Sequence, residues 1–462
     1  MNTLQKFLGI SLLLTTSFLS SVSQAAFKIP AYETYTLDNG LQVYLMQQDE
    51  VPMIDLRLVV KVGAINDGNQ FGLANLTSEA LQFGSGKLSK NEIEDELAFL
   101  GANLSVNAAM EMTSINISFA AKDEVQLLPL FANIALNPSF NVANFDKYKK
   151  RFLSQLEQRK ESPRDIINDA FARLYFGSHP YGNPVSGDND SVTALTLDSV
   201  KSFYGDYYTP SNSALIVVGD FNKKHWRGQI KTLFGHWKGQ APKETLVRLG
   251  PSPAQSNVLL INKDDASETT LLIGSKGISA SHPDAVAVQV INTILGGRFT
   301  SWLNDALRVN SGLTYGARSR FNSYQYGGSF SISTFTKNAT TFEAIDLAKK
   351  TYRKLWEEGI DKETLASAKA YVKGQFPPRY ETSGQLAALL ARMWSQDLDD
   401  SYINNFENNV DSMNVIKANE IARRLFPENN LQYVLVGKAD DIREKAKTYG
   451  ELKEINIKDL KF

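Results

Sequence analysis

The segment Gly72-Leu-Ala-Asn75-Leu-Thr-Ser78-Glu79 places three functional side chains at a spacing that suits a catalytic centre on a helix. Residues i and i+4 of a helix share one face, so Asn75 and Glu79 lie one above the other with Ser78 beside them. Two metal ligands and a general base at this spacing activate a metal-bound water. The side chains present do not suit that chemistry, because zinc prefers imidazole, thiolate or carboxylate ligands and serine is no general base near neutral pH.

The frame around these residues resembles the inverted zinc motif His-x-x-Glu-His of the pitrilysin (insulinase-type) metallopeptidase family. In that motif two histidines hold the metal and the glutamate deprotonates its water. Asn75, Ser78 and Glu79 stand in the three slots. The family's third ligand is a glutamate on a later helix, and the corresponding position here is Gln155. The resemblance therefore implies a family member whose metal centre has been removed.

No other group of residues in the sequence replaces the lost ligands. The four histidines, at positions 179, 225, 236 and 282, offer no pair at helical spacing. Asn75, Glu79 and Gln155 offer oxygen ligands for a hard cation, but a single carboxylate makes such a site weak. The sequence predicts no metal or other cofactor in this chain, and a hydrogen-bonded polar patch where zinc would bind.

A second group of functional residues lies in the segment Arg308-Val-Asn-Ser-Gly-Leu-Thr-Tyr315, preceded by Gly296-Gly-Arg-Phe-Thr-Ser-Trp-Leu303. The segment is similar to the family's Leu-Arg-x-x-x-Gly-Leu-x-Tyr sequence. There, the Arg and Tyr bind the substrate backbone and stabilise the oxyanion of the tetrahedral intermediate. A guanidinium fork and a phenol suit that task. Val309 departs from the family, which carries an acid after the Arg. The alternative is an Arg at a helix C-terminus and a surface Tyr with structural roles only.

A third segment, Gly101-Ala-Asn-Leu-Ser105-Val106-Asn-Ala108, corresponds to the family's substrate-pairing edge strand. Backbone groups make most of the bonds in such pairing, so it tolerates the changes at Ser105 and Val106. An ordinary strand without that role is an equal alternative.

The elements that position these residues repeat along the chain. One part of the sequence resembles a segment that builds the scaffold in this family. It consists of His179-Pro-Tyr-Gly182, Tyr208-Thr-Pro-Ser-Asn212 and Ala214-Leu-Ile-Val-Val-Gly219. Its last part is echoed by Phe426 to Asn430 and Gln432 to Gly437. We therefore expect two homologous α+β halves, each a mainly antiparallel sheet packed by helices. The expected domains are 27–240, with the altered zinc site, and 258–462, with Arg308 and Tyr315, joined by a Pro-bearing linker at 241–257.

Residues 1–26 have the pattern of a secretory signal peptide, with cleavage expected after Ala25 or Ala26. A membrane anchor is the alternative, but the apolar run is short for a bilayer span. The chain has no cysteine, which together with export indicates a periplasmic protein. No later stretch is long and apolar enough to span a membrane. The 49 basic and 50 acidic residues give no electrostatic reason to expect nucleic acid as a partner.

These observations favour a non-catalytic subunit of a heteromeric periplasmic zinc peptidase, without independent activity. Such a chain supplies Arg308, Tyr315 and half of a substrate chamber to a zinc-bearing homologous subunit that cleaves a peptide or unfolded polypeptide. The alternative is an inert, family-derived scaffold or peptide-binding protein. An independent hydrolase is disfavoured, because the sequence has neither a Gly-x-Ser-x-Gly elbow nor a cysteine nucleophile.

Overall fold

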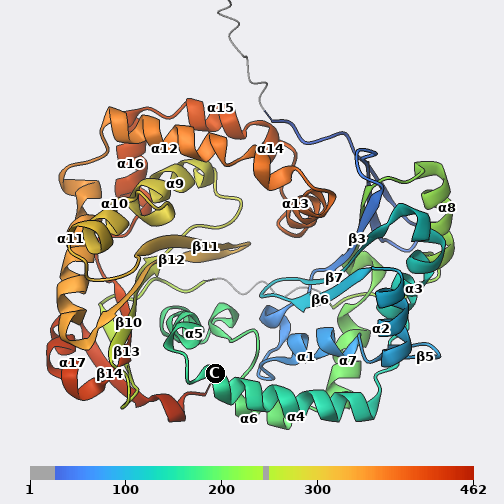
Figure 1. The fold of residues 1–462 in the computed structure, drawn as a ribbon, viewed down its shortest axis with the longest axis horizontal. Helices are drawn as coiled ribbons and strands as arrows, with labels where there is room; N and C mark the ends of the chain where they lie inside the picture. The colour runs from blue at the N-terminus through green and yellow to red at the C-terminus, as the bar shows by residue number, and fades with distance from the viewer. Residues whose placement is uncertain (1–26, 243–248, 462) are drawn as a thin grey trace, which may run out of the picture.

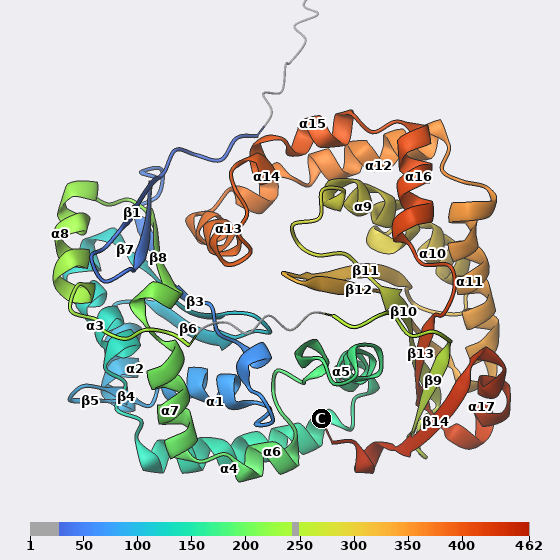
Figure 2. The same cartoon turned by 180° about the vertical axis from the view of Figure 1, so that it is seen from behind.

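The computed structural model describes residues 27–242 and 249–461. The predicted signal peptide and the middle of the predicted linker lie outside the described residues. The chain forms two six-stranded sheets, each covered by helices (Figures 1 and 2). The strand orders are β1-β2-β8-β3-β7-β6 and β11-β12-β10-β13-β9-β14, and most neighbouring pairs are antiparallel. The predicted architecture of two α+β halves is confirmed.

The first half contains eight strands and eight helices within the described residues. The strands are β1 (Glu33–Thr36), β2 (Gln42–Gln47), β3 (Met53–Val60), β4 (Gly84–Ser85), β5 (Leu88–Ser89), β6 (Asn103–Ala108), β7 (Thr113–Ala120) and β8 (Ser213–Gly219). The helices are α1 (Leu73–Ala80), α2 (Lys90–Phe99), α3 (Glu124–Leu136), α4 (Val142–Arg159), α5 (Pro163–Phe176), α6 (Asn189–Ala194), α7 (Leu197–Tyr207) and α8 (Lys223–Phe234).

The second half repeats this order in the described residues with fewer strands and one more helix. The strands are β9 (Asn257–Asn262), β10 (Glu268–Lys276), β11 (Arg318–Tyr324), β12 (Gly327–Lys337), β13 (Gln432–Gly437) and β14 (Glu451–Asn456). The helices are α9 (Ala285–Asn292), α10 (Trp302–Asn304), α11 (Thr341–Glu357), α12 (Lys362–Gly374), α13 (Ser383–Ser395), α14 (Ser401–Asn404), α15 (Phe406–Asp411), α16 (Val415–Leu425) and α17 (Ala439–Ala446).

The internal repeat extends to single hydrogen bonds. Lys149 on α4 donates through Nζ to two carbonyl oxygens at the end of α6, those of Thr193 and Leu195, at 2.8 and 2.7 Å. Lys369 on α12 makes the same pair of bonds at the end of α15, to the carbonyls of Asp411 and Met413, at 2.8 and 2.9 Å. A cation at the C-terminus of a helix satisfies carbonyls that have no partner within the helix. The two halves therefore join corresponding helices, α4 to α6 and α12 to α15, by the same kind of hydrogen bond.

One helix of each half packs on the sheet of the other half. Helix α5 packs on β10 and β13, where its residues Ile166, Ile167, Ala170 and Phe171 join the apolar cluster of the second sheet. Helix α13 packs on β3 and β8 of the first sheet through Leu386, Ala387, Leu390 and Ala391. Both helices occupy the centre of Figure 1, each between its own half and the sheet that it covers. The halves of the sequence are therefore not separate packing units.

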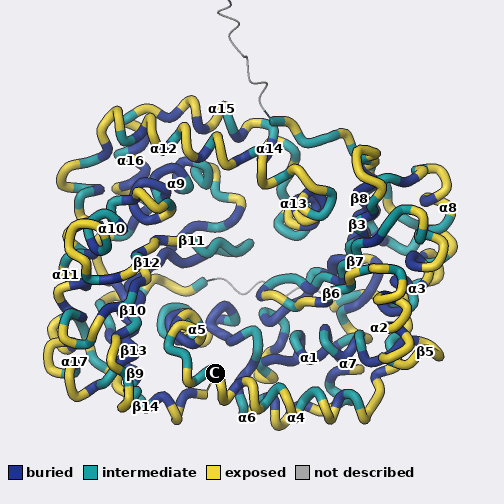
Figure 3. Tube along the Cα trace, in the orientation of Figure 1, coloured by how far each residue is buried: buried dark blue, intermediate teal, exposed yellow. Residues whose placement is uncertain are grey.

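Two strands at the middle of the sheets form the most buried part of the fold. Every residue of β8 and of β13 is buried (Figure 3). A strand that is apolar on both faces must be covered on both faces, and the exchanged helices cover the second face.

Among the described residues, no helix is long and apolar enough to cross a membrane.

Candidate functional site

Helix α1, which carries the altered zinc slots, is held at its N-terminus by a buried carboxylate. Gly72 precedes the helix with φ = 89°, and a Cβ there would lie 2.8 Å from the carbonyl oxygen of Ser186. Asp67 accepts the backbone N–H groups of Gly72 and Ala74, each at 2.8 Å. These bonds satisfy donors that have no partner within the helix. Burial raises the pKa of Asp67 to about 7, although the backbone hydrogen bonds oppose that rise.

The three slots of α1 form local polar contacts. Ser78 is buried, and its hydroxyl donates to the carbonyl oxygen of Asn75 at 2.8 Å. Glu79 is half-buried, and α4 brings Tyr148 and Arg151 to it. Burial raises the pKa of Glu79, while a hydrogen bond with Tyr148 and the charge of Arg151 oppose the rise. Glu79 therefore lies near a phenol and a guanidinium of α4.

Gln155 lies on α4 and is exposed to solvent. It is seven residues from Tyr148 and four from Arg151, which is helical spacing for one face. Among the described residues, no hydrogen bond joins Gln155 to Asn75 or Glu79, and no group of three His, Cys, Asp or Glu side chains could hold a metal. The side chains present do not fit zinc, because amides and hydroxyls are poor ligands and Arg151 places a positive charge near the single carboxylate.

Ser105 and Val106 lie on β6, which is the edge strand of the first sheet. In the part of the chain that the structure describes, β6 pairs with β7 on one side and with no strand on the other. Val106 is buried, and Ser105 accepts a hydrogen bond from Asn116 of β7 at 3.3 Å. Helix α1 packs against this strand, so the altered zinc slots and the open edge are neighbours. An open edge offers backbone groups to an added strand.

Arg308 lies in a π-helical turn, Asp305–Asn310, that follows α10 in the second half. Its guanidinium carbon is 4.7 Å from the ring centroid of Phe299, which is 65% exposed. The carbonyl of Arg308 accepts the N–H of Gly312, which has φ = 66° and turns the chain towards Tyr315. The aromatic ring therefore positions the guanidinium at the protein surface.

Tyr315 is 82% exposed and leans on the ring of Phe335 of β12, with ring centroids 6.4 Å apart. The guanidinium carbon of Arg164, from the start of α5 in the first half, lies 3.9 Å from the same ring centroid. Thr314, next to Tyr315, is buried and bonded to Thr334 of β12 at 3.0 Å. The phenol is thus presented to solvent from an ordered backbone.

The structure separates the two predicted groups of site residues. The altered slots lie on α1 in the first half, and Arg308 and Tyr315 follow α10 in the second half (Figure 1). Among residues 27–242 and 249–461, no hydrogen bond or ring contact joins Arg308 or Tyr315 to α1. In the described residues, Arg308 and Tyr315 therefore do not engage this chain's own altered site.

Sequence analysis missed Tyr148, Arg151, Phe299 and Phe335 as partners of these residues. Tyr148 and Arg151 precede Gln155 at helical spacing, which is the signal that could have identified them. Phe299 lies within the quoted segment before Arg308 but has no chemistry of its own. Phe335 has no local signal, because it lies on β12, far from Tyr315 in the sequence, and meets it only in the folded chain.

Two family models match consecutive parts of the chain. The model described as "Insulinase (Peptidase family M16)" matches residues 43–189, and "Peptidase M16 inactive domain" matches residues 194–372. The chain belongs to peptidase family M16. Within this family it is an inactive member, because the zinc slots on α1 and α4 carry Asn75, Ser78, Glu79 and Gln155.

Relatives of similar length support this family. An "uncharacterized zinc protease YmxG" of Bacillus subtilis is 21% identical over 86% of this chain and 96% of its own length. A "non-peptidase homolog YmxG" of Helicobacter pylori is also 21% identical, over 81% of this chain and 86% of its own length. "Cytochrome b-c1 complex subunit 1, mitochondrial" of cattle is 23% identical over 60% of this chain and 58% of its own length.

Solved structures have the same fold. A peptidase M16 inactive domain from Pseudomonas fluorescens superposes with a TM-score of 0.83 at 24% identity, covering 88% of this chain and 98% of that one. A protease from Helicobacter pylori gives a TM-score of 0.79 at 23% identity, covering 88% and 99%. At this identity the match establishes the fold alone.

Proposed function

We propose that this chain is the non-catalytic subunit of a heteromeric zinc peptidase that is exported to the periplasm. It supplies Arg308 and Tyr315 to a peptide held at the zinc of a homologous partner, and it forms half of the chamber around that peptide. The observation that carries the proposal is the contrast between the two sites. The slots on α1 do not fit zinc, whereas Arg308 is half-buried beside the ring of Phe299 and Tyr315 is exposed beside the ring of Phe335.

The chemistry of the pair fits the task. Peptide hydrolysis develops negative charge on the scissile carbonyl oxygen, and donors aimed at that oxygen stabilise the transition state. Arg308 offers a fixed fork of N–H donors and Tyr315 a hydroxyl donor. The zinc and the general base must then come from the partner, since Asn75 and Ser78 supply neither. The names of the relatives, which include both zinc proteases and a non-peptidase homologue, are compatible with such a division of labour.

The second candidate function is binding of an extended peptide without any part in its cleavage. The open edge of β6 beside α1 favours it, because an added strand could pair there with no metal required. The two functions differ in whether Arg308 and Tyr315 affect turnover.

The test is purification of the chain from its native host under mild conditions, with zinc and peptidase activity measured on the isolated chain and on its complexes. We expect the isolated chain to bind no stoichiometric zinc and to cleave no peptide. We expect the complex to contain a homologous subunit, one equivalent of zinc for that subunit, and activity.

Two results would contradict the proposal. One is an equivalent of tightly held zinc in the isolated chain. The other is a chain that is monomeric in native extracts by both size and cross-linking. As a control, Asn75→His alone should leave the isolated chain free of zinc, because a site that needs three ligands is not restored by one.

A further inference from the structure

The first described residues of the chain reach across to the second half of the molecule and dock there. The backbone nitrogen of Phe27 donates to the carboxylate of Glu407 on α15 at 2.9 Å. Three more hydrogen bonds fix the segment: Lys28 Nζ to the carbonyl of Asn404 at 3.0 Å, Ile29 N to Asn404 Oδ1 at 3.0 Å, and the Tyr32 hydroxyl to Asp400. Strand β1 of the first sheet starts immediately afterwards, so residues 27–32 link that sheet to α14 and α15 (Figure 1).

The ring of Phe27 holds the start of this segment in place. It stacks on Tyr380 with ring centroids 5.5 Å apart and meets the edge of Phe376 at 5.8 Å. All three rings belong to the apolar cluster of the second half. The main-chain nitrogen of Phe27 is therefore held at Glu407 by apolar packing as well as by hydrogen bonds.

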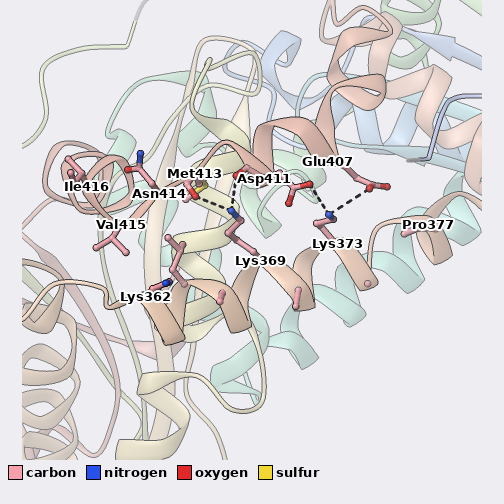
Figure 4. Close-up of a pocket in the computed structure, with 14 residues that line it drawn as sticks. Lys362, Lys369, Lys373, Pro377, Glu407, Asp411, Met413, Asn414, Val415 and Ile416 are labelled. Atoms are coloured by element: carbon pink, nitrogen blue, oxygen red, sulfur yellow. Dashed lines mark hydrogen bonds and ion pairs between the residues drawn. The ribbon is translucent and has the colours of Figure 1, made fainter. Parts of the chain in front are cut away.

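Glu407 is a mostly buried carboxylate with one oxygen directed at that nitrogen. Its side chain is 17% exposed, and Lys373 Nζ lies 4.0 Å from the other oxygen. Figure 4 shows that Lys373 also binds Asp411, which it approaches more closely, at 2.8 Å. A partly buried carboxylate gains much more from a cationic donor than from a neutral amide.

We propose that the leader is cleaved after Ala25 or Ala26 and that the α-ammonium group created by cleavage binds Glu407. Hydrolysis of that peptide bond by a protease of the export route adds one water, leaves the new carboxylate on the leader, and leaves the new amine on the mature chain. An α-amino group has an ordinary pKa of about 7.7–8.0 and so is mostly protonated near neutral pH. Cleavage after Ala26 places the charge on the Phe27 nitrogen itself. Cleavage after Ala25 places the charge on the residue that precedes Phe27.

Processing then has a structural consequence. In the uncleaved chain, Phe27 gives Glu407 a neutral N–H. The mature chain carries a charged ammonium group on that nitrogen, or one residue before it. Charge-assisted hydrogen bonds are roughly twice as strong as neutral ones. Removal of the leader therefore strengthens the link that residues 27–32 form between the two halves. This inference rests on export of the chain and not on its role in a peptidase.

The first test is N-terminal sequencing together with the intact mass of the exported protein. The expected first residue is Ala26 or Phe27. A mature chain that starts at any other residue, or that retains the leader, overturns the proposal.

The second test is hydrogen–deuterium exchange of a peptide covering residues 27–36 in the mature protein. Glu407→Gln should speed exchange there about tenfold, because it removes the charge that binds the ammonium. Glu420→Gln, at an exposed position of α16, is the matched control and should leave exchange unchanged. Equal exchange in the wild type and in Glu407→Gln overturns the proposal.

A third measurement keeps the proposal testable if Glu407→Gln does not fold. The N-terminus of the folded wild-type protein is carbamylated, which removes the α-amino charge and leaves Glu407 intact. We expect exchange at 27–36 to rise about tenfold while peptides from α16 stay unchanged. No change at 27–36 overturns the proposal. Failure to find a zinc-bearing partner would alter none of these results, so failure of the peptidase role can be told apart from failure of this proposal.

Discussion

Glu111 accepts the backbone N–H of Gln325 with both carboxylate oxygens, at 2.9 and 3.1 Å. Glu111 lies in the turn of the β6–β7 hairpin, and Gln325 lies in the turn of the β11–β12 hairpin, which is its counterpart in the second half. Tyr181 donates its hydroxyl to the same carboxylate at 2.5 Å. The edge hairpins of the two repeats are therefore joined at their tips by one acidic side chain.

This junction predicts a large effect of Glu111→Ala. The change removes a charged acceptor from a buried tyrosine and from a backbone N–H, and a lost hydrogen bond to a charged group costs about 1.5–3 kcal/mol. We expect faster hydrogen exchange at residues 322–328 and a lower free energy of unfolding. Gln325→Ala is the control, since it keeps the backbone N–H and removes only a side-chain bond to Asp397 at 3.1 Å. Equal effects of the two variants would contradict the role given to Glu111.

The raised pKa of Asp67 predicts that the free energy of unfolding depends on pH. Burial raises its pKa to about 7 in the folded protein, from an ordinary value of 3.8. Between these values the folded protein holds a proton that the unfolded chain has lost. The resulting stability is fully present below about pH 4 and is lost as the pH rises to about 7, on the order of 4 kcal/mol in total.

The measurement is denaturant unfolding from pH 4 to pH 8 for the wild type and for Asp67→Asn, which does not titrate. The free energy of unfolding of the wild type minus that of Asp67→Asn should fall from pH 4 to about pH 7 and then remain constant. A difference that is the same at every pH would contradict this account of Asp67.

The sequence predicts local features well and contacts between distant elements poorly. The helix carrying Asn75 and Glu79 follows from its own periodicity. The Ser-x-x-Glu spacing of Ser89 and Glu92 is the local signature of the capping box that opens α2. The duplication is visible because strands that cross a sheet's centre, such as 214–219 and 432–437, need the same apolar residues.

The exchange of α5 and α13 could not be predicted in this way. Either helix would pack equally well, by its apolar stripe, on the sheet of its own half. Which sheet it covers depends on the path of the chain between the halves. The same limit applies to the candidate site. The sequence identifies Arg308 and Tyr315, but their contacts with Phe299 and Phe335 depend on how a turn and a strand meet in space.

The contact between Phe299 and Arg308 predicts a modest effect of Phe299→Leu on the assembled peptidase. An exposed cation–π contact contributes about 0.5–1 kcal/mol, so its loss should lower kcat/KM about two- to fivefold. Steady-state kinetics on the complex measures this effect. Val309→Leu, at a neighbouring exposed position, is the control and should leave kcat/KM unchanged. A Phe299→Leu complex as active as the wild type would show that the ring does not position Arg308.

Under the proposed function, this chain acts on substrate at the zinc of its partner through Arg308 and Tyr315. The direct measurement is peptide turnover by the purified complex containing Arg308→Ala or Tyr315→Phe, with assembly and zinc content measured on the same preparations. Arg423→Ala removes an exposed guanidinium from α16 and serves as the control.

Loss of one oxyanion donor costs about 2.7–4 kcal/mol, so each variant should reduce turnover roughly a hundred- to a thousandfold. Assembly and zinc content should stay unchanged, and the Arg423→Ala complex should keep its full activity. Turnover within about twofold of the wild type in both Arg308→Ala and Tyr315→Phe, in correctly assembled complexes, would contradict the claim and favour the peptide-binding alternative.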